Sequence, residues 1–357
     1  MMLMIAGAAI VPPQAPPYAA RQRADVVQLE DARTQTIVSI TPSVGNIAFE
    51  MTVKGQNALH WPYTSTAEFR AKPAMAGIPF VGPWANRLDE TAFYANGTRH
   101  AFDMALGNVR GPIPIHGFLT TTDRWQAVEM KADERSAWVT SRLDFSRQAD
   151  WMKQWPFAHT IDLTYRLQDG VLEVQTKISN TGTEPMPVAI GFHPYFRLTD
   201  SPRDQWTLSL GARTRWVLAP NKIPTGETEP ADRLFDRPGT RLVEYNLDDV
   251  FSDLVRDANG RATMTVAGKS QRLSVQVGPN YRAVVIWAPN AADTGRGSQR
   301  LSGPPNPVNR GDFICIEPMA GITDATNLAH KGIYKELQSV PPGGVWQESF
   351  WIRVEGF

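Results

Sequence analysis

The sequence predicts an all-β fold, arranged as a single-domain antiparallel β-sandwich. Two observations carry this prediction: apolar and polar residues alternate in most segments, and 28 prolines with 27 glycines separate those segments by turns. The 11 tryptophans are a third observation, because aromatic side chains suit the half-buried surface of a sheet. The length of 357 residues also permits two domains, but no change in composition marks a boundary.

The clearest strands form a hairpin in the middle of the chain. In residues 160–167 (TIDLTYRL) and 171–179 (VLEVQTKIS) every second side chain is apolar or small, which is typical of a strand with one buried face. Asp169 and Gly170 between them are typical of a hairpin turn. Further strands are predicted at 273–278, 283–287, 337–342 and 349–355.

Helices are expected to be few. The sequence predicts one turn of helix within residues 245–254. Clusters of proline and glycine predict long loops at 77–83, 111–114, 219–230 and 303–307. We expect functional side chains to lie on such loops, at one edge of the sandwich.

The first 24 residues are predicted to be a flexible leader or a signal segment, followed by the folded domain at 25–357. Residues 1–11 are apolar and a proline-rich stretch follows them. A secretory signal normally begins with basic residues, which this segment lacks. We therefore expect a cytoplasmic protein, with a periplasmic or secreted location as the alternative if residues 1–20 act as a signal peptide.

The charge balance excludes several classes of partner. Lys and Arg number 36, as do Asp and Glu, whereas a nucleic-acid-binding protein normally carries a basic excess. No apolar run approaches the roughly 18 residues of a membrane span. Cys315 is the one cysteine, which excludes an internal disulfide and a cysteine-cluster metal site. We expect a monomer or homodimer with no nucleic-acid or membrane partner.

Four segments place polar side chains among apolar or proline-rich neighbours, where an unpaired charge is costly. These side chains are Asn86 with Arg87, His116, His193 and Glu317. Together they suit a site that polarises and deprotonates a hydroxylated substrate. Each also has a structural explanation: a buried hydrogen bond for either histidine, a loop tie for the amide, or an ion pair between the carboxylate and the arginine.

A metal site is the main competing use of His116, His193 and Glu317, since two histidines and a carboxylate can hold zinc or iron. The three residues lie far apart in the chain, and no H-x-H, H-x-x-x-H or H-E-x-x-H spacing occurs. The Gly-x-Ser-x-Gly, P-loop and dinucleotide-binding motifs are absent as well. We therefore expect no metal and no cofactor.

The polar segments, in this order, resemble the aldose 1-epimerase (galactose mutarotase-like) family. The resemblance begins near residue 36 and rests on Asn86-Arg87, HGF at 116–118, GFHPYF at 191–196 and EPM at 317–319.

A weaker match is LDDVF at 247–251, which resembles the family's Asp-x-x-Phe segment. This match assigns the sugar-contacting carboxylate to Asp248 rather than to Asp249.

The resemblance implies a β-supersandwich that interconverts the α and β anomers of a free aldohexose, a small-molecule monosaccharide substrate, without cofactor or metal. Glu317 would be the general base on the anomeric hydroxyl, and His193 the general acid at the ring oxygen. The substrate-binding residues that it implies are Arg87, Asn86, His116 and Asp248.

Several alternatives remain at this level. Arg296, Arg300 and Arg310 in the 293–310 loop would suit the phosphate of a hexose 6-phosphate, the substrate of other mutarotases of this superfamily. A catalytically silent carbohydrate-binding module and a lyase or hydrolase acting on a larger glycan are further possibilities. Among the tryptophans we expect Trp84, rather than Trp61 or Trp287, to stack on a sugar ring.

Overall fold

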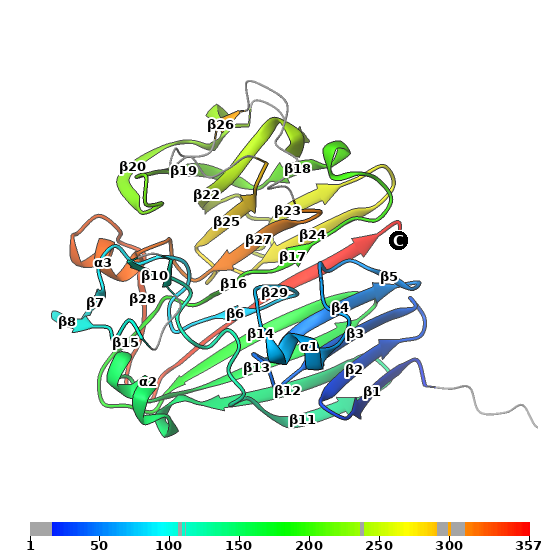
Figure 1. The fold of residues 1–357 in the computed structure, drawn as a ribbon, viewed down its shortest axis with the longest axis horizontal. Coiled ribbons are helices and arrows are strands. Elements are labelled where there is room, and N and C mark those ends of the chain that lie inside the picture. Colours follow the sequence, from blue (N-terminus) through cyan, green and yellow to red (C-terminus); the bar gives the residue numbers. More distant parts are fainter. Residues whose placement is uncertain (1–15, 106–108, 111, 236–238, 291–298, 301–310) are drawn as a thin grey trace, which may run out of the picture.

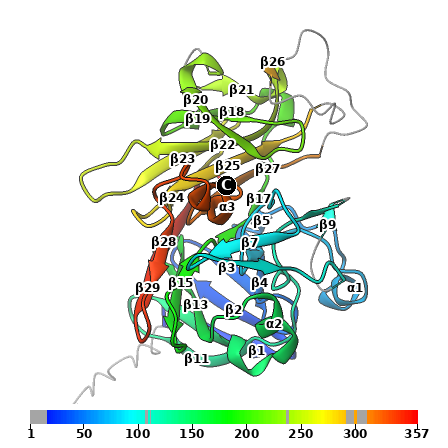
Figure 2. The ribbon, with the colours of Figure 1, turned by 90° about the vertical axis from the view of Figure 1, so that its left-hand side faces the viewer.

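The computed structural model describes residues 16–105, 109–110, 112–235, 239–290, 299–300 and 311–357. Most of its elements are antiparallel strands, which stack in two layers around one shared apolar core (Figures 1 and 2). The predicted all-β antiparallel sandwich is confirmed.

The first layer is a nine-stranded antiparallel sheet that runs the length of the molecule. Its strands, in spatial order, are β11 (Gln126–Ala132), β12 (Ala137–Asp144), β13 (His159–Gln168), β14 (Val171–Asn180), β29 (Val345–Glu355), β24 (Arg272–Val277), β23 (Ala262–Ala267), β18 (Thr207–Leu210) and β21 (Thr240–Arg241). The strands predicted at 160–167, 171–179, 273–278 and 349–355 all lie in this sheet, so these predictions are confirmed.

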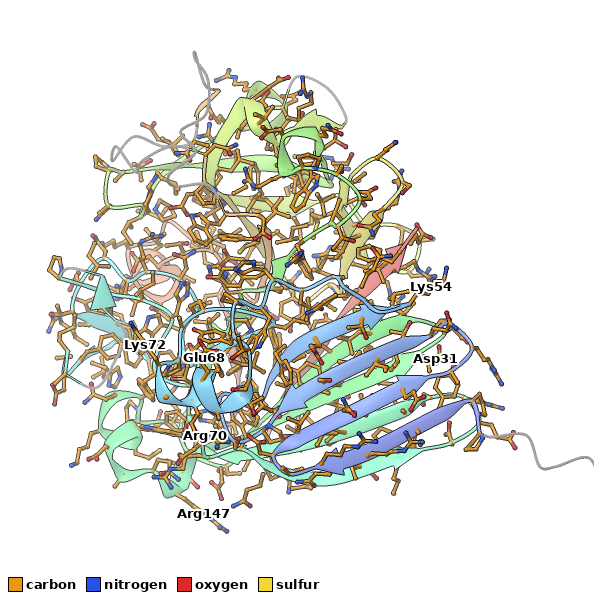
Figure 3. The ribbon with its side chains drawn as sticks, turned by 45° about the vertical axis from the view of Figure 1, so that its right-hand side comes forward. Asp31, Lys54, Glu68, Arg70, Lys72 and Arg147 are labelled. Carbon is orange, nitrogen blue, oxygen red and sulfur yellow. The ribbon has the colours of Figure 1, made fainter. Side chains whose placement is uncertain are left out.

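The second layer begins with a five-stranded sheet over one half of the first. Its strands are β1 (Tyr18–Arg23), β2 (Val26–Asp31), β3 (Thr36–Thr41), β4 (Ile47–Val53) and β5 (Gln56–Asn57). Figure 3 shows these strands side by side, with α1 (Thr66–Ala71), which carries Glu68 and Arg70, next to them.

A second nine-stranded sheet completes this layer. Its strands are β20 (Pro224–Pro230), β19 (Ala212–Leu218), β22 (Tyr245–Leu254), β25 (Ala283–Ala288), β27 (Ile314–Met319), β16 (Gly191–Phe192) and β6 (Phe80–Val81), with β17 (Tyr195–Phe196) paired to β27 and β26 (Gln299–Arg300) paired to β22. The predicted strand at 283–287 is β25. This sheet contacts the first layer through Phe192 and Phe350, whose ring centroids lie 4.8 Å apart.

The remaining strands and α-helices are short, and in the described part of the chain four 3-10 helices of three residues each accompany them: Phe145–Arg147, Arg203–Gln205, Ala231–Arg233 and Leu242–Glu244. The short strands and α-helices are the strand pairs β7 (Ala92–Ala95) with β8 (Thr98–Ala101), β9 (Val109–Arg110) with β10 (Ile113–Pro114), and β15 (Met186–Val188) with β28 (Gln338–Val340), and the helices α2 (Ala149–Gln154) and α3 (Ala325–His330). Strand β28 confirms the strand predicted at 337–342. The α-helices of the described residues have six residues each, far fewer than a membrane-spanning helix needs.

The central hairpin shows how the sequence pattern specifies the sheet. Buried and partly exposed residues alternate along all of β13 and β14, so one face of both strands enters the core. Asp169 and Gly170 both have positive φ values, 49° and 70°, as a two-residue turn of the twist-matching type requires. The turn and the alternation agree, which fixes one register over the whole hairpin.

The second nine-stranded sheet has two different faces, and this arrangement creates the site. On one face, Ile286 and Ile316 enter the main core. On the other face, Val285 packs into a smaller apolar cluster with Leu328 of α3, and Glu317 lies beside it on the same face. A charged residue is therefore directed away from the main core, into a region that helix α3 and the loops cover.

Three sequence-based predictions of local structure are wrong. The long loop predicted at 219–230 contains the strand β20 (Pro224–Pro230), which pairs with β19. The segment 245–254 contains no helix, because it is the ten-residue strand β22, paired on both sides by β19 and β25. The predicted leader of residues 1–24 is too long, because Tyr18–Arg23 forms β1 and pairs along its whole length with β2. Residues 1–15 lie outside the described residues, so the location of the protein stays a prediction.

A glycine substitution tests how the HGF segment is packed. Gly117 has φ +59°, and a Cβ there would lie 2.0 Å from the carbonyl oxygen of Gly82. Gly97 also has a positive φ, +76°, but open space around it. Because Gly117→Ala adds a backbone clash to the left-handed strain, we expect it to lower the free energy of unfolding by about 2 kcal/mol more than Gly97→Ala does.

Urea denaturation of both variants measures this difference. Equal losses of stability in the two variants would contradict the packing described here.

Candidate active site

A cavity of about 170 Å³ opens on the outer face of the second nine-stranded sheet. Its volume exceeds what one water molecule needs and is smaller than that of pockets for drug-sized ligands. Its lining combines polar groups with two aromatic rings and two apolar side chains: Met75, Asn86, Arg87, Ile115, His116, His193, Tyr195, Asp248, Trp287 and Glu317. All six residues singled out from the sequence as site residues therefore line one pocket.

Strand register brings His193 and Glu317 together. Gly191 of β16 pairs with Met319, and Tyr195 of β17 pairs with Cys315, both on β27. The same register, continued between these pairs, sets His193 opposite Glu317. Their side chains touch, with His193 Nε2 3.1 Å from Glu317 Oε1, and both are buried.

Two loop segments hold the amide, the guanidinium and the second histidine. The N–H of His116 donates to the carbonyl of Asn86 at 2.9 Å, and the N–H of Asn86 donates to His116 Nδ1 at 3.1 Å. Asn86 and His116 have φ values of 58° and 61°, an uncommon conformation for residues other than glycine. This reciprocal pairing holds both strained residues in place, as is frequent at functional sites.

Asn86 also orients its neighbour. The Oδ1 atom of Asn86 accepts hydrogen bonds from the backbone N–H of Arg87 at 2.9 Å and from its guanidinium at 3.1 Å. The Nδ2 group of Asn86 is then the part of the amide that can donate to a ligand.

Two cations converge on the carboxylate of Asp248. The guanidinium of Arg87 lies 3.6 Å from Asp248 Oδ2, and Nζ of Lys222 lies 3.9 Å from the same oxygen. Lys222 is buried in the turn between β19 and β20. The carboxylate of Asp248 is thus shared by two cations of the protein.

Aromatic rings form the other wall. The rings of His193 and Tyr195 stack with centroids 4.8 Å apart, and Trp287 meets His193 edge-on at 5.7 Å. The expectation that Trp84 contacts a ligand is wrong, because Trp84 is buried below the pocket against Phe102 and Trp155. Trp287, next to Asp248 in the sheet register, is the tryptophan that lines the cavity.

Burial shifts the pKa values of Glu317 and His193 in the directions that favour their uncharged forms. Burial, helped by the charge of Asp248, raises the pKa of Glu317 well above its ordinary value, although Arg87 opposes this shift. Burial also lowers the pKa of His193 to about 3, and Arg87 acts in the same direction. Both shifts favour a state in which the pair holds one proton, on Glu317, while His193 is neutral.

The described residues contain no group of three or more His, Cys, Asp or Glu side chains placed to hold a metal ion. Glu317 contacts His193 directly, and Nδ1 of His116 accepts a hydrogen bond from the backbone. Each of these three residues thus has a protein partner at one of the atoms that would ligate a metal.

Comparison with known proteins identifies the family. The family model described as aldose 1-epimerase matches residues 27–353. The chain belongs to the aldose 1-epimerase family.

A curated protein and several solved structures are also similar to this chain. The uncharacterized protein YihR of Escherichia coli strain K12 is 25% identical over 240 residues, which cover 66% of this chain and 73% of YihR. A galactose mutarotase-like protein from Clostridium acetobutylicum superposes with a TM-score of 0.77 at 21% identity, over 95% of this chain and 98% of that chain. The galactose 1-epimerase of Lactobacillus acidophilus NCFM superposes with a TM-score of 0.70 at 15% identity, over 95% and 98%.

At these identities the structural likenesses show the fold, whereas the family match carries the function in general terms. Membership of the aldose 1-epimerase family implies an isomerase of the epimerase or mutarotase type.

The sequence analysis did not single out the lining residues Met75, Ile115 and Tyr195, nor Lys222, which contacts Asp248. Tyr195 belongs to the GFHPYF motif and lies two residues after His193, so the motif could have indicated its place in the pocket. Ile115, next to His116, could have been found in the same way. Lys222 lies in a proline-rich loop far from any motif, and only the folded chain brings it to Asp248.

The pairing of Asn86 with His116 predicts a specific tautomer. Because Nδ1 of His116 accepts the backbone N–H of Asn86, the proton of the neutral imidazole must lie on Nε2. Long-range ¹H–¹⁵N correlation spectra of histidine side chains should show the Nε2–H form for His116 in the free protein. A dominant Nδ1–H form would contradict the arrangement.

Proposed function

We propose that this protein interconverts the α and β anomers of a free aldohexose by general acid–base catalysis. The observation that carries the proposal is the buried contact between His193 and Glu317 inside a pocket of small-molecule size. Family membership supports the reaction class, and the pocket supports the sugar and the roles of the residues.

The reaction requires one proton to leave and another to arrive. Opening a cyclic hemiacetal removes the proton of the anomeric hydroxyl O1 and adds a proton to the ring oxygen O5 as the C1–O5 bond breaks. Rotation about C1–C2 and reclosure on the other face then give the second anomer. Glu317 takes the proton from O1, and His193 delivers one to O5.

The proton count of the pair matches this chemistry. Ring opening starts from the Glu317 carboxylate with the His193 imidazolium and ends with protonated Glu317 and neutral His193. These two forms differ by the position of one proton across a 3.1 Å contact, and burial favours the second. The pair therefore serves ring opening in one form and ring closure in the other, without any proton from solvent.

The remaining lining residues hold the sugar. The guanidinium of Arg87, Nε2–H of His116 and the amide of Asn86 can donate to hydroxyl oxygens, and Asp248 can accept from a hydroxyl. Trp287 presents an aromatic surface to the apolar face of a pyranose ring.

The charges favour an unphosphorylated sugar. Arg87 and Lys222 both contact Asp248, whose carboxylate compensates part of their charge within the protein and so lowers the positive charge that faces the pocket. The phosphate-binding alternative rests on the arginine side chains of the 293–310 segment. In this segment only the backbone of residues 299–300 is described, so this alternative lies outside the described residues.

Polarimetry or NMR of freshly dissolved α-D-glucose and α-D-galactose tests the function. The wild-type protein should accelerate their mutarotation. Glu317→Gln and His193→Asn should each lower kcat by about 10²–10⁴-fold, because each removes one of the two proton-transfer groups. Matched controls are the exposed Glu184→Gln and His330→Asn, which should keep full activity.

Circular dichroism of every variant verifies folding. Full activity of Glu317→Gln would overturn the assignment of the base. A wild-type protein that binds monosaccharides without accelerating their mutarotation would instead be a catalytically silent carbohydrate-binding module.

A further inference from the structure

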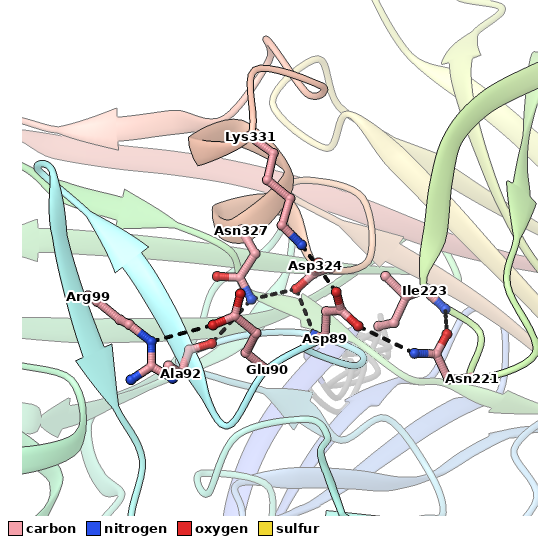
Figure 4. Close-up of polar contacts among 9 residues, drawn as sticks. All are labelled: Asp89, Glu90, Ala92, Arg99, Asn221, Ile223, Asp324, Asn327 and Lys331. Carbon is pink, nitrogen blue, oxygen red and sulfur yellow. Dashed lines mark hydrogen bonds and ion pairs between the residues drawn. The ribbon is translucent and has the colours of Figure 1, made fainter.

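A cluster of polar side chains lies outside the pocket, at the point where three chain segments meet (Figure 4). We name it the anchor cluster. Its members are Asp89, Asn221, Asp324, Asn327 and Lys331. None of the five is among the residues that line the pocket. Two of the three segments, however, lie next to residues of the site: Asp89 follows Arg87 by two positions, and Asn221 precedes Lys222, which contacts Asp248.

Asp324 precedes α3 but does not cap it. An aspartate in this position usually accepts a hydrogen bond from an N–H of the first helical turn, and this one makes no such bond. Its Oδ1 atom instead accepts from the backbone N–H of Asp89 at 2.9 Å and from Nδ2 of Asn327 at 2.8 Å. The carboxylate is therefore directed at the segment that carries Arg87.

A second bond from Asp324 reaches the same segment. The backbone N–H of Asp324 donates to the carbonyl of Arg87 at 3.1 Å. One residue thus holds the chain on both sides of Leu88. Asp324 is buried and has a φ of 61°, a strained conformation that persists only where surrounding contacts impose it.

The anchor cluster also reaches the second cation of the site. The carboxylate of Asp89 accepts from Nδ2 of Asn221 at 3.4 Å and from Nζ of Lys331 at 3.1 Å. Asn221 Oδ1 accepts the backbone N–H of Ile223 at 3.2 Å, which closes the turn around Lys222. The two cations that contact Asp248 therefore extend from segments that the cluster ties together.

We propose that Asp324 is a positioning residue, whose carboxylate oxygen and backbone N–H hold the segment 86–89 so that Arg87 and Asn86 meet the substrate in the correct place. Through Asp89 and Asn221, the same anchor extends to the turn of Lys222. The expected change in KM rests on the function proposed above. The expected loosening of segment 86–89 does not depend on that function.

The role requires an acceptor oxygen at this position rather than a charge. Burial, with the nearby charge of Asp89, raises the pKa of Asp324 to about 7, while hydrogen bonds and Lys331 oppose the shift. An asparagine retains the acceptor and tolerates a left-handed backbone. A glycine tolerates the same backbone but removes the acceptor.

Three variants separate positioning from general stability. Asp324→Gly should raise KM for the monosaccharide about tenfold while kcat changes less than about threefold, because it loosens substrate-binding groups and leaves Glu317 and His193 in place. Asp324→Asn should stay within about threefold of the wild type in both constants. The control Asp169→Gly, at a turn with φ 49° far from the pocket, should change neither.

Amide hydrogen exchange provides a readout that needs no activity. In Asp324→Gly the backbone amides of 86–89 and 221–223 should exchange faster than in the wild type, and in Asp169→Gly they should not. Unchanged exchange in these segments would overturn the proposal, whether or not the protein is a mutarotase. Absence of activity in the wild type, with faster exchange in Asp324→Gly, would overturn the proposed function alone.

Two kinetic outcomes would also overturn the proposal. One is a folded Asp324→Gly with wild-type KM, and the other is an Asp324→Asn as impaired as the glycine variant. If Asp324→Gly does not fold, the exposed Asn221→Ala takes its place, since it cuts the link from Asp89 to the Lys222 turn. It should speed exchange in 221–223 and raise KM about threefold, and wild-type values of both would overturn the extension to Lys222.

Discussion

The buried contact between His193 and Glu317 is the interaction around which the site is organised. Two titratable groups removed from water are costly unless they share a proton or pair as ions, and here they do so across 3.1 Å. The contact depends on the register of β27 against β16 and β17, which leaves His193 opposite Glu317 between two paired positions. A shift of one residue in that register would turn Glu317 into the apolar core.

The rest of the fold supplies what this contact needs. The inner face of the second nine-stranded sheet packs on the first layer, while its outer face carries Glu317 and the contact with His193. Loops then add the sugar-binding groups from distant parts of the chain. Asn86, His116 and Asp324 all adopt left-handed conformations, with φ values from 58° to 61°, so the strained backbone of the described residues includes the segments that surround the pocket.

The sequence predicted the parts of this structure that local patterns specify. Alternation predicted β13, β14 and β29, because each has one face in the core. It failed at β22, where Asp248 and Asp249 interrupt the apolar pattern: one faces the pocket and the other pairs with Arg215. Sequence motifs indicated all six site residues. The contact of Lys222 with Asp248 and the hydrogen bonds of Asp324 depend on tertiary structure that no local pattern encodes.

The central claim is that His193 and Glu317 together hold one proton near neutral pH. The dependence of kcat/KM on pH tests this claim most directly. Because the pKa of His193 is lowered to about 3 and that of Glu317 is raised, a second proton binds only in strong acid. With the uncatalysed rate subtracted, kcat/KM should not fall as the pH drops from about 7 to about 5, because His193 takes up no second proton in this range. A loss of activity centred on the ordinary histidine value of 6.5 would contradict the account.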